Sequence, residues 1–290
     1  NSGASAPPMR RRIGVSGPPN DAAPGSPASS SVVRPWPRGP KTEMPRFFVP
    51  QHDIADGKAR LQGGEFRHLQ RVLRLPEGDT VTLFDDAGIE HQGVIVSLSP
   101  RVATVRITAS AAPARESPLA VTLYQGVPKG RKMDLIVEKA TELGVVSIVP
   151  FVSAFGTVSV AAAASKRERW QRIALAAAKQ SGRTTIPEIA ATLTFPEVLT
   201  AAAAMDRALL FFEDAGATPL PAADTAAPKP ATAAVVIGPE GGFSADEGTR
   251  ALNGGIVVCG LGPRVLRTET AALVATALVQ ARWGDLDAGR

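Results

Sequence analysis

The sequence predicts a small β-barrel followed by a mainly parallel α/β domain. Short alternating runs of apolar and polar residues dominate residues 44–115, as in half-buried antiparallel strands. From residue 118 to residue 286, strand-like runs alternate with helical ones, which predicts a parallel sheet covered by helices. Two glycine-rich turns, at 238–242 and 260–262, each follow a strand-like run in this second region. A chain of 290 residues has room for two such domains.

Residues 1–43 differ in composition from the rest of the chain. They hold 9 of the 25 prolines and no periodic apolar pattern, so we expect a disordered extension or sequence upstream of a natural start at Met44. They also carry six basic and two acidic residues, which accounts for +4 of the net charge of +5. The basic character of the whole chain is therefore weak support for nucleic-acid binding, which needs a local cluster of charge.

The predicted barrel contains four alternating runs, a hairpin turn and one helical stretch. The turn is Asp85–Gly88, between two of the runs. The helical stretch, Glu65–Leu73, has Phe66, Leu69, Val72 and Leu73 at the spacing of one helix face. The expected strands are Arg46–Val49, Thr80–Phe84, Glu90–Leu98 and Ala103–Thr108.

The α/β region alternates strands and helices after a short linker at 112–118. The expected strands are Leu119–Gln125, Val145–Phe151, Ala208–Phe212, Ala234–Ile237 and Ile256–Cys259. The expected helices are Lys132–Leu143, Lys166–Gly182, Pro196–Met205, one after Ser244, and Thr268–Trp283. Ala215–Thr232, rich in Ala, Pro and Thr, is expected to be a flexible insertion. Ligands bind beyond the carboxyl ends of strands in such sheets, which is where both glycine turns fall.

The first glycine turn has features of a ligand-binding loop. Gly238–Gly242 follows an apolar run, and Ser244-x-x-Glu247 has the form of a capping box that opens a helix. Backbone N–H groups at such a helix start face a ligand. The spacing matches neither a phosphate loop nor a dinucleotide fingerprint, and the carboxylate of Glu240 would repel a phosphate. A cationic ligand, or one rich in donors, suits this loop better.

Composition excludes several other classes of site. The three histidines, His52, His68 and His91, all precede residue 116, and Cys259 is the only cysteine. A Ser-His-Asp triad, a Cys-His pair or a zinc site is therefore not expected in the C-terminal half, and no metal is expected. No apolar run reaches about 18 residues, so no membrane span is expected. With no possible intrachain disulfide, we expect a reducing, cytoplasmic location.

The order of several motifs resembles that of a known family. Ile-Gly-Pro-Glu-Gly-Gly at 237–242, followed by Leu-Gly-Pro-Arg-Val-Leu-Arg at 261–267, resembles the signature of the SPOUT-class RNA methyltransferases. More narrowly, it is similar to the RsmE family, which methylates N3 of a uridine in 16S ribosomal RNA. The similarity runs from Met44 to Leu286. The supporting segments are Pro45–Val49, His68–Asp79, Lys129–Asp134, Lys139–Val145 and Gln180–Arg183.

The resemblance implies a fold, a cofactor and partners. It implies a PUA-like, RNA-binding β-barrel at 44–115 and a SPOUT methyltransferase domain at 118–286 with a C-terminal trefoil knot. It further implies a homodimer, S-adenosylmethionine as the cofactor and 16S ribosomal RNA, within the small ribosomal subunit, as the substrate. Because Thr268–Trp283 is apolar nearly all round, we expect it to be buried in the core and in a subunit interface.

Site residues follow from the resemblance and from the chemistry that it implies. Uridine N3 must lose a proton before it can attack, so a base or a cation that stabilises the anion is needed. The catalytic candidates are Glu240 or Glu269 as base and Arg264 or Arg267 as anion stabiliser. The cofactor-binding candidates are Phe212, Glu213, Ile237, Gly238, Pro239, Glu240, Gly241, Gly242, Leu261, Gly262, Leu266, Thr268 and Thr270. The RNA-binding candidates are Arg46, His68, Arg71, Arg74, Lys129, Arg131, Lys132 and Arg183.

Other interpretations stay open at this stage. An enzyme of the same class could methylate another RNA position or a ribose 2′-hydroxyl. The chain could instead be an RNA-binding module without activity. Arg267 and Glu269 could pair only to hold the fold, and the basic helix Lys166–Gly182 could simply be a solvated face with Trp170 on its apolar stripe.

Overall fold

The computed structural model describes residues 44–213, 220 and 228–286. The predicted disordered segment 1–43 and most of the predicted insertion Ala215–Thr232 lie outside the described residues. Within the described part of the chain, no helix is long and apolar enough to cross a membrane.

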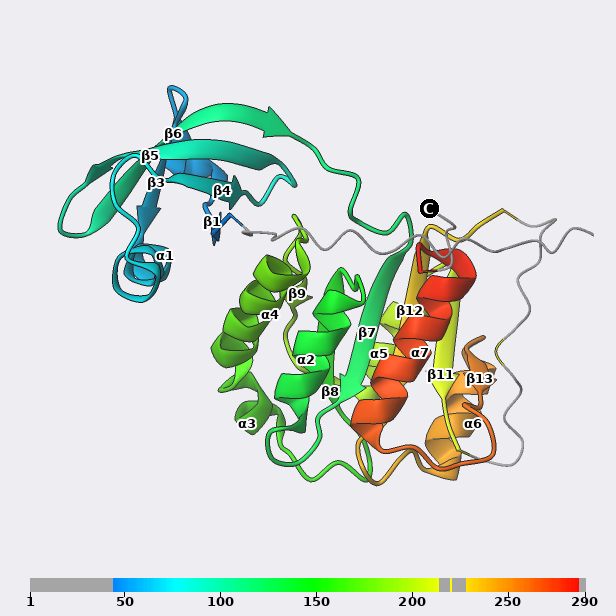
Figure 1. The fold of residues 1–290 in the computed structure, drawn as a ribbon. Helices are drawn as coiled ribbons and strands as arrows, with labels where there is room; N and C mark the ends of the chain where they lie inside the picture. Colours follow the sequence, from blue (N-terminus) through cyan, green and yellow to red (C-terminus); the bar gives the residue numbers. More distant parts are fainter. Residues whose placement is uncertain (1–43, 214–219, 221–227, 287–290) are drawn as a thin grey trace, which may run out of the picture. The chain divides into compact units, whose positions relative to one another are not determined.

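The N-terminal region forms a curled, open half-barrel of six strands (Figure 1). Their order is β1-β4-β5-β6-β3-β2, with β1 parallel to β4 and the other neighbours antiparallel. The four predicted strands are present. The two that the prediction missed, β2 and β3, lie at the opposite edge from β1. The elements are β1 Arg46–Phe48, the 3₁₀ turn η1 Gln51–Asp53, β2 Ile54–Ala55, β3 Lys58–Gln62, β4 Thr80–Phe84, β5 Glu90–Leu98 and β6 Val102–Ala111.

The helical stretch beside this sheet is wound differently from the prediction. It begins as an α-helix, α1 (Gly63–Arg67), and continues as a π-helix, η2 (His68–Leu73). Phe66 and Leu69 are buried as predicted, but Val72 is 65% exposed and Leu73 is 39% exposed. The prediction of one apolar face was wrong for these two residues, because i→i+5 winding carries them off the face that a 3.6-residue period assigns.

The C-terminal region is a parallel sheet of seven strands. Its main path is β10-β8-β7-β12-β11-β13, and β9 also pairs with β8. The strands are β7 Ala120–Gly126, β8 Ser147–Val152, β9 Glu188–Ile189, β10 Leu193–Thr194, β11 Arg207–Phe211, β12 Thr232–Ile237 and β13 Val257–Cys259. The helices are α2 Lys132–Glu142, α3 Val160–Ala164, α4 Arg167–Ser181, α5 Phe195–Ala203, α6 Ala245–Asn253 and α7 Thr268–Trp283.

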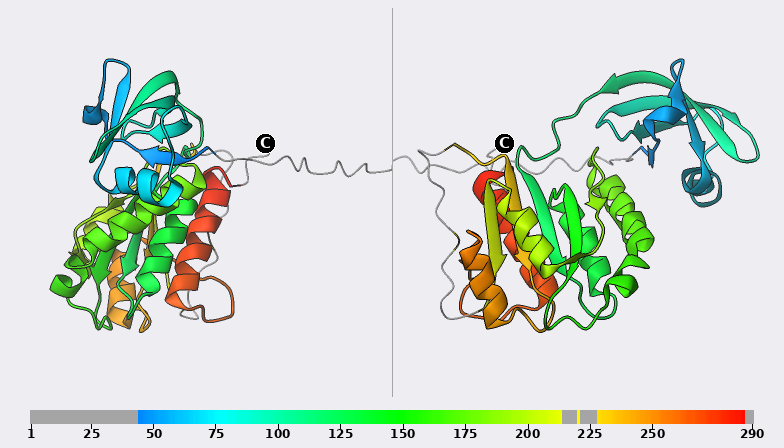
Figure 2. Two further views of the ribbon diagram at one scale, coloured as in Figure 1. Left: turned by 60° about the vertical axis from the view of Figure 1, so that its left-hand side comes forward. Right: turned by 180° about the vertical axis from the view of Figure 1, so that it is seen from behind.

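Alternation along the central strands divides the core between the two faces of the sheet. In β12, Ala233, Val235 and Ile237 pack with α2, α4 and α7, whereas Ala234 and Val236 pack with α5 and α6. Figure 2 shows helices on both faces of the sheet. Strands buried on both sides read as continuous apolar runs, as in this sequence. Because the strands are parallel, their carboxyl ends meet at one edge, and both glycine turns lie there.

Candidate active site

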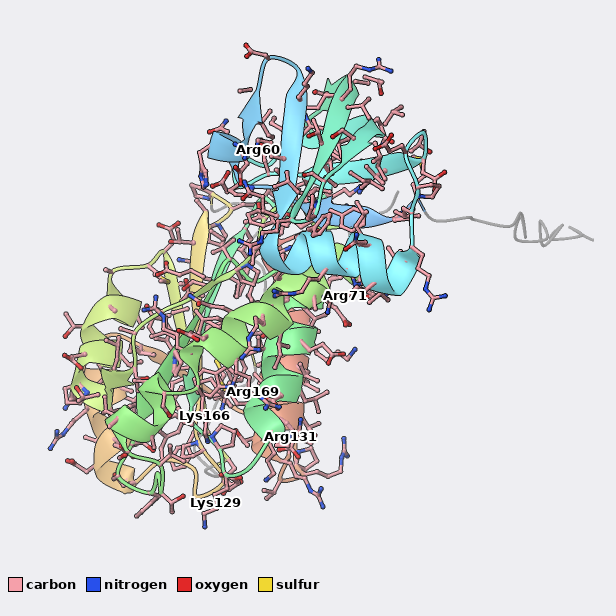
Figure 3. All side chains as sticks on the ribbon, turned by 90° about the vertical axis from the view of Figure 1, so that its left-hand side faces the viewer. Arg60, Arg71, Lys129, Arg131, Lys166 and Arg169 are labelled. Atoms are coloured by element: carbon pink, nitrogen blue, oxygen red, sulfur yellow. The ribbon has the colours of Figure 1, made fainter. Side chains whose placement is uncertain are left out.

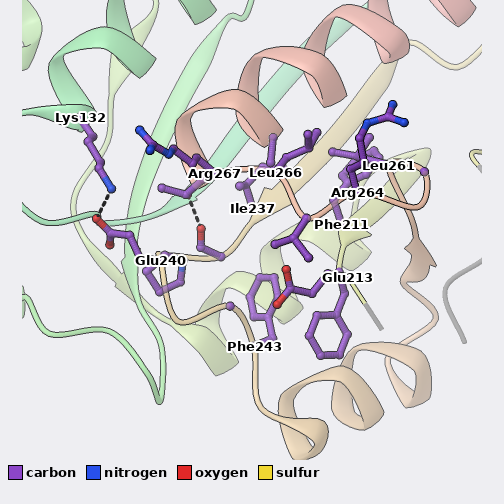
Figure 4. Close-up of a pocket in the computed structure, with 18 residues that line it drawn as sticks. Lys132, Phe211, Glu213, Ile237, Glu240, Phe243, Leu261, Arg264, Leu266 and Arg267 are labelled. Carbon is purple, nitrogen blue, oxygen red and sulfur yellow. Dashed lines mark hydrogen bonds and ion pairs between the residues drawn. The ribbon is translucent and has the colours of Figure 1, made fainter. Parts of the chain in front are cut away.

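A cavity of about 320 Å³ lies at the carboxyl ends of β11, β12 and β13 (Figure 4). Cavities of this size hold small ligands and cofactors. One wall is the loop after β12 and another is the loop after β13, so both predicted glycine turns contribute. The lining residues are Lys132, Phe211, Phe212, Glu213, Ile237, Gly238, Pro239, Glu240, Gly242, Phe243, Leu261, Gly262, Arg264, Val265, Leu266, Arg267, Thr268 and Ala271.

The loop after β12 is fixed by the predicted capping box. The Ser244 N–H donates to Glu247 Oε2 at 2.8 Å, and the Glu247 N–H donates to Ser244 Oγ at 3.2 Å. This arrangement satisfies two donors at the start of α6. Gly242 adopts a φ of +67°, which favours glycine. The capping box and the left-handed Gly242 together define the shape of this turn.

A buried polar network joins the two glycine loops. The Thr268 hydroxyl donates to the Gly238 carbonyl at 2.5 Å, and Gln125 Nε2 donates to Thr268 Oγ1 at 2.9 Å. Gln125 is fully buried at the end of β7. It also donates to the carbonyls of Gly126 and Gly238, at 2.9 and 3.4 Å. The start of α7 is thus tied to the first loop directly through Thr268 and also through Gln125 at the end of β7.

Glu240 is held by two lysines at the edge of the cavity. Its Oε1 accepts from Lys132 Nζ at 2.9 Å and from the Lys129 N–H at 3.1 Å. Burial raises the pKa of Glu240, but the hydrogen bonds from Lys132 and from backbone N–H groups outweigh it, and the net shift is downward. Such a carboxylate is a weak proton acceptor.

The other catalytic candidates lie in different positions. Arg264 and Arg267 are exposed and line the cavity. Glu269 lies outside the lining. Its Oε2 is buried without a hydrogen bond and lies 3.8 Å from Lys132 Nζ. Glu240, Arg264 and Arg267 therefore line the cavity, whereas Glu269 contacts Lys132 and does not line it.

The rest of the wall combines apolar side chains with one carboxylate. Ile237, Leu261 and Leu266 form an apolar side, and Figure 4 shows the Glu213 carboxylate pointing into the space beside Phe243. A ligand with an apolar ring and a positive charge suits this combination. Burial raises the pKa of the nearby Cys259 thiol to about 11, so the thiol is protonated at neutral pH and is a poor nucleophile.

The predicted cofactor residues gather at this cavity, with two exceptions. Gly241 faces the outer side of its loop, where a Cβ would lie 2.7 Å from Phe155 Cβ, and Thr270 is exposed on α7. Sequence reasoning missed the buried Gln125, whose only signal was its place at a strand end. It also missed a group of side chains that line the cavity next to predicted residues, namely Phe211, Phe243, Val265 and Ala271.

The predicted RNA-binding residues divide into exposed and buried groups. Arg71, Arg74, Lys129 and Arg131 are exposed, and Figure 3 shows Arg71 on the half-barrel and Lys129 and Arg131 on the α/β domain. His68 is half-buried, with its ring edge-on to Phe47. Lys132 lines the cavity instead.

Two predicted RNA contacts have structural partners instead. Arg183 is 4% exposed and donates to Glu116 Oε2 at 2.6 Å and to the carbonyls of Thr141 and Val145. Arg46 pairs with Glu90 at 3.3 Å and donates to the Ala178 carbonyl. The guanidinium of Arg183 is buried and fully engaged, and that of the half-buried Arg46 is held by Glu90 and Ala178, so neither residue is proposed as an RNA contact.

Comparison with known proteins identifies the family. Residues 115–280 match the RNA methyltransferase domain, and residues 61–108 match the RNA methyltransferase PUA domain. The chain is 33% identical over 245 residues to the ribosomal RNA small subunit methyltransferase E of Bacillus subtilis, covering 81% of this chain and 96% of that protein. The chain belongs to the ribosomal RNA small subunit methyltransferase E family. Its half-barrel is a PUA-like domain, and its parallel domain is a SPOUT methyltransferase domain, as the resemblance implied.

Solved structures of similar chains share this fold. One is a ribosomal RNA small subunit methyltransferase E from Neisseria gonorrhoeae bound to S-adenosylmethionine. It is 34% identical, with a TM-score of 0.74 over 84% of this chain and 99% of that chain. Another is a methyltransferase from Legionella pneumophila with bound S-adenosylmethionine. It is 31% identical, with a TM-score of 0.75 over 84% of this chain and 99% of that chain.

Proposed function

We propose that this protein uses S-adenosylmethionine to methylate N3 of one uridine in 16S ribosomal RNA, within the small ribosomal subunit. The observation that carries the proposal is the cavity between the two glycine loops. It lies at the ligand-binding edge of a parallel sheet, and related structures of the same fold hold S-adenosylmethionine.

The cavity residues fit this cofactor. Ile237, Leu261 and Leu266 would enclose the adenine, and backbone N–H groups of the loop 238–242, other than those of Pro239 and Gly242, and of residues 266–270 would donate to it and to the methionine end. Glu213 would attract the ammonium group or bind the ribose. The absence of a phosphate-loop spacing and the two carboxylates, Glu213 and Glu240, suit a cofactor that is cationic and lacks phosphate. When bound, the cofactor supplies a methyl group activated by a positively charged sulfur.

The residues around the methyl acceptor must raise the acidity of N3. Arg264 and Arg267 are exposed at the cavity and would stabilise the uridine anion on O2 or O4. Glu240 is engaged by Lys132 and Lys129, and Glu269 lies outside the lining. We therefore assign the stabilising role to the two arginines, and the N3 proton leaves to solvent at the open side of the cavity.

The proposal also covers the oligomeric state, the knot and the separate roles of the two domains. We propose a cytoplasmic homodimer in which α7 contributes to the interface, because Leu278 on this helix is 42% exposed. A trefoil knot is supported by the path from edge strand β13 back to α7, which packs against β7 and β12 at the middle of the sheet. We assign RNA binding to the domain at 44–115, through Arg71, Arg74 and His68. We assign catalysis to the domain at 118–286, where Lys129 and Arg131 would make further RNA contacts.

Ribosomal RNA from a strain that lacks this protein tests the proposal. Mass spectrometry of its 16S nucleosides should show the loss of 3-methyluridine, restored by the wild-type chain. Loss of a ribose-methylated nucleoside, or of a methylated base in another RNA, would instead support the alternative substrates. Failure of the purified chain to bind S-adenosylmethionine by calorimetry would support an RNA-binding module without activity.

A further inference from the structure

One aromatic side chain is displayed on the surface beside the candidate active site. Phe155 is 52% exposed, and it is the only aromatic residue among the exposed large hydrophobic residues of the described chain. An exposed ring does not contribute the free energy of burial that a buried phenylalanine contributes to folding. Phe155 follows β8, at the same sheet edge as the cavity.

The turn that carries Phe155 is fixed to the first glycine loop. The Ala154 N–H donates to Glu247 Oε1 at 2.9 Å, and this same glutamate forms the capping box at the start of α6. The Gly156 N–H donates to the Ser153 carbonyl at 2.9 Å. Gly241 has an ordinary backbone conformation, but a Cβ there would lie 2.7 Å from Phe155 Cβ. Gly241 therefore allows close packing of the two loops, and backbone hydrogen bonds on either side of Phe155 hold the turn that displays it.

Cationic side chains lie on the segment that follows the neighbouring strand, β7. Strands β7 and β8 are neighbours, with Gly126 paired to Phe151, so the segments that follow them leave the sheet side by side. The first carries Lys129 and Arg131, both exposed. The Lys129 N–H donates to Glu240, the residue before Gly241. Figure 3 shows Lys129, Arg131, Lys166 and Arg169 on one side of the α/β domain.

We propose that Phe155 is a stacking platform for a nucleobase that flanks the target uridine in a single-stranded segment of the substrate RNA. Single-stranded RNA is held by aromatic rings that stack on bases, together with cations that contact phosphates. Phe155 packs against Gly241, and the Lys129 N–H donates to Glu240, so both residues contact the loop that lines the proposed cofactor cavity. Gly241 separates Phe155 from the cavity lining, so the ring serves a flanking base and not the reacting one. This inference rests on the proposed function.

Methyl transfer to unmethylated small ribosomal subunits tests the inference with the full chain. Phe155→Leu should raise the KM for subunits about fivefold or more, the lower limit expected for the loss of one stacked base. Its kcat, its affinity for S-adenosylmethionine and its oligomeric state should stay within twofold of wild type. Phe155→Trp restores a ring and should restore the KM. Leu252→Ala is the control, because Leu252 is a 60% exposed apolar residue on α6 outside the cavity lining.

Several results would overturn the inference while leaving the proposed function intact. Phe155→Leu could retain the wild-type KM, or Phe155→Trp could be as impaired as Phe155→Leu. A loss of cofactor affinity in Phe155→Leu would show that the ring only packs the loop, and a changed oligomeric state would show a subunit contact. By contrast, a wild-type chain that transfers no methyl group to the subunits would refute the proposed function itself, and this inference with it.

Discussion

Thr268→Val tests whether the buried network holds the two glycine loops together. The substitution keeps the volume of the 5% exposed side chain and removes only its hydroxyl. That hydroxyl donates to Gly238 at 2.5 Å and accepts from Gln125 at 2.9 Å. Gln125 and the Gly238 carbonyl each keep a hydrogen bond in the variant, because Gln125 still donates to the Gly126 and Gly238 carbonyls. The cost should therefore lie in the lower part of the range for disrupted buried hydrogen bonds, about 1–2 kcal/mol.

The same change should weaken cofactor binding, because Gly238 lines the cavity. A loss of about 1 kcal/mol corresponds to roughly fivefold in affinity for S-adenosylmethionine. Urea unfolding can be followed through the fluorescence of the buried Trp170 and Trp283 in the α/β domain, and calorimetry gives the affinity. The control is Thr249→Val, which removes an exposed hydroxyl bonded to Ala245 within α6 and should change stability by less than about 0.5 kcal/mol. Equal stability and equal affinity in the two variants would refute the role of the network.

Four further predictions follow from the geometry. Gly262→Val should reduce cofactor affinity, because Gly262 has a φ of +90° and a β-branched residue resists that conformation; normal affinity by calorimetry would contradict it. Arg264→Ala and Arg267→Ala should slow single-turnover methylation more than they weaken cofactor binding, and a loss of affinity alone would reassign them to structure. The pKa of Glu240 is lower in the folded chain than its ordinary value of 4.5. The ionised carboxylate therefore stabilises the fold above pH 4.5, and this stabilisation is lost as the pH falls through the lower pKa of the folded state. The free energy of unfolding measured in urea should thus fall more steeply in acid for wild type than for Glu240→Gln, and equal falls would contradict this. Arg183→Met should destabilise the chain by about 1–3 kcal/mol, because it leaves the Thr141 and Val145 carbonyls without their buried donor and Glu116 without its ion pair, and an unfolding midpoint like that of wild type would exclude this.

Regular elements were predictable where one period dominates the sequence. Thr80–Phe84 and Thr268–Trp283 have the predicted bounds, because alternation and helical periodicity are strong signals there. Strands of two residues, such as β9 and β10, carry no detectable period. The π-helix at His68–Leu73 was also missed, since its winding leaves no distinct signal in side-chain type.

The candidate site was predictable where it is local in sequence. The glycine loops, the capping box and the residues beside them lie within short segments. Gln125 and Thr268 are 143 residues apart, so their contact depends on the packing of α7 against β7, which no local pattern specifies. Arg183 and Arg131 look alike as sequence, yet one is buried against Glu116 and the other is exposed. Only tertiary packing separates a buried structural arginine from one whose side chain is exposed to solvent.

Transfer of a labelled methyl group tests the central claim most directly. The purified chain is incubated with methyl-labelled S-adenosylmethionine and with small ribosomal subunits from a strain that lacks the protein, and the RNA is then digested to nucleosides. We expect label in 3-methyluridine from 16S RNA, close to one methyl group per subunit, and little label with Gly262→Val. Label on a ribose, on another base, or on no nucleoside at all would contradict it.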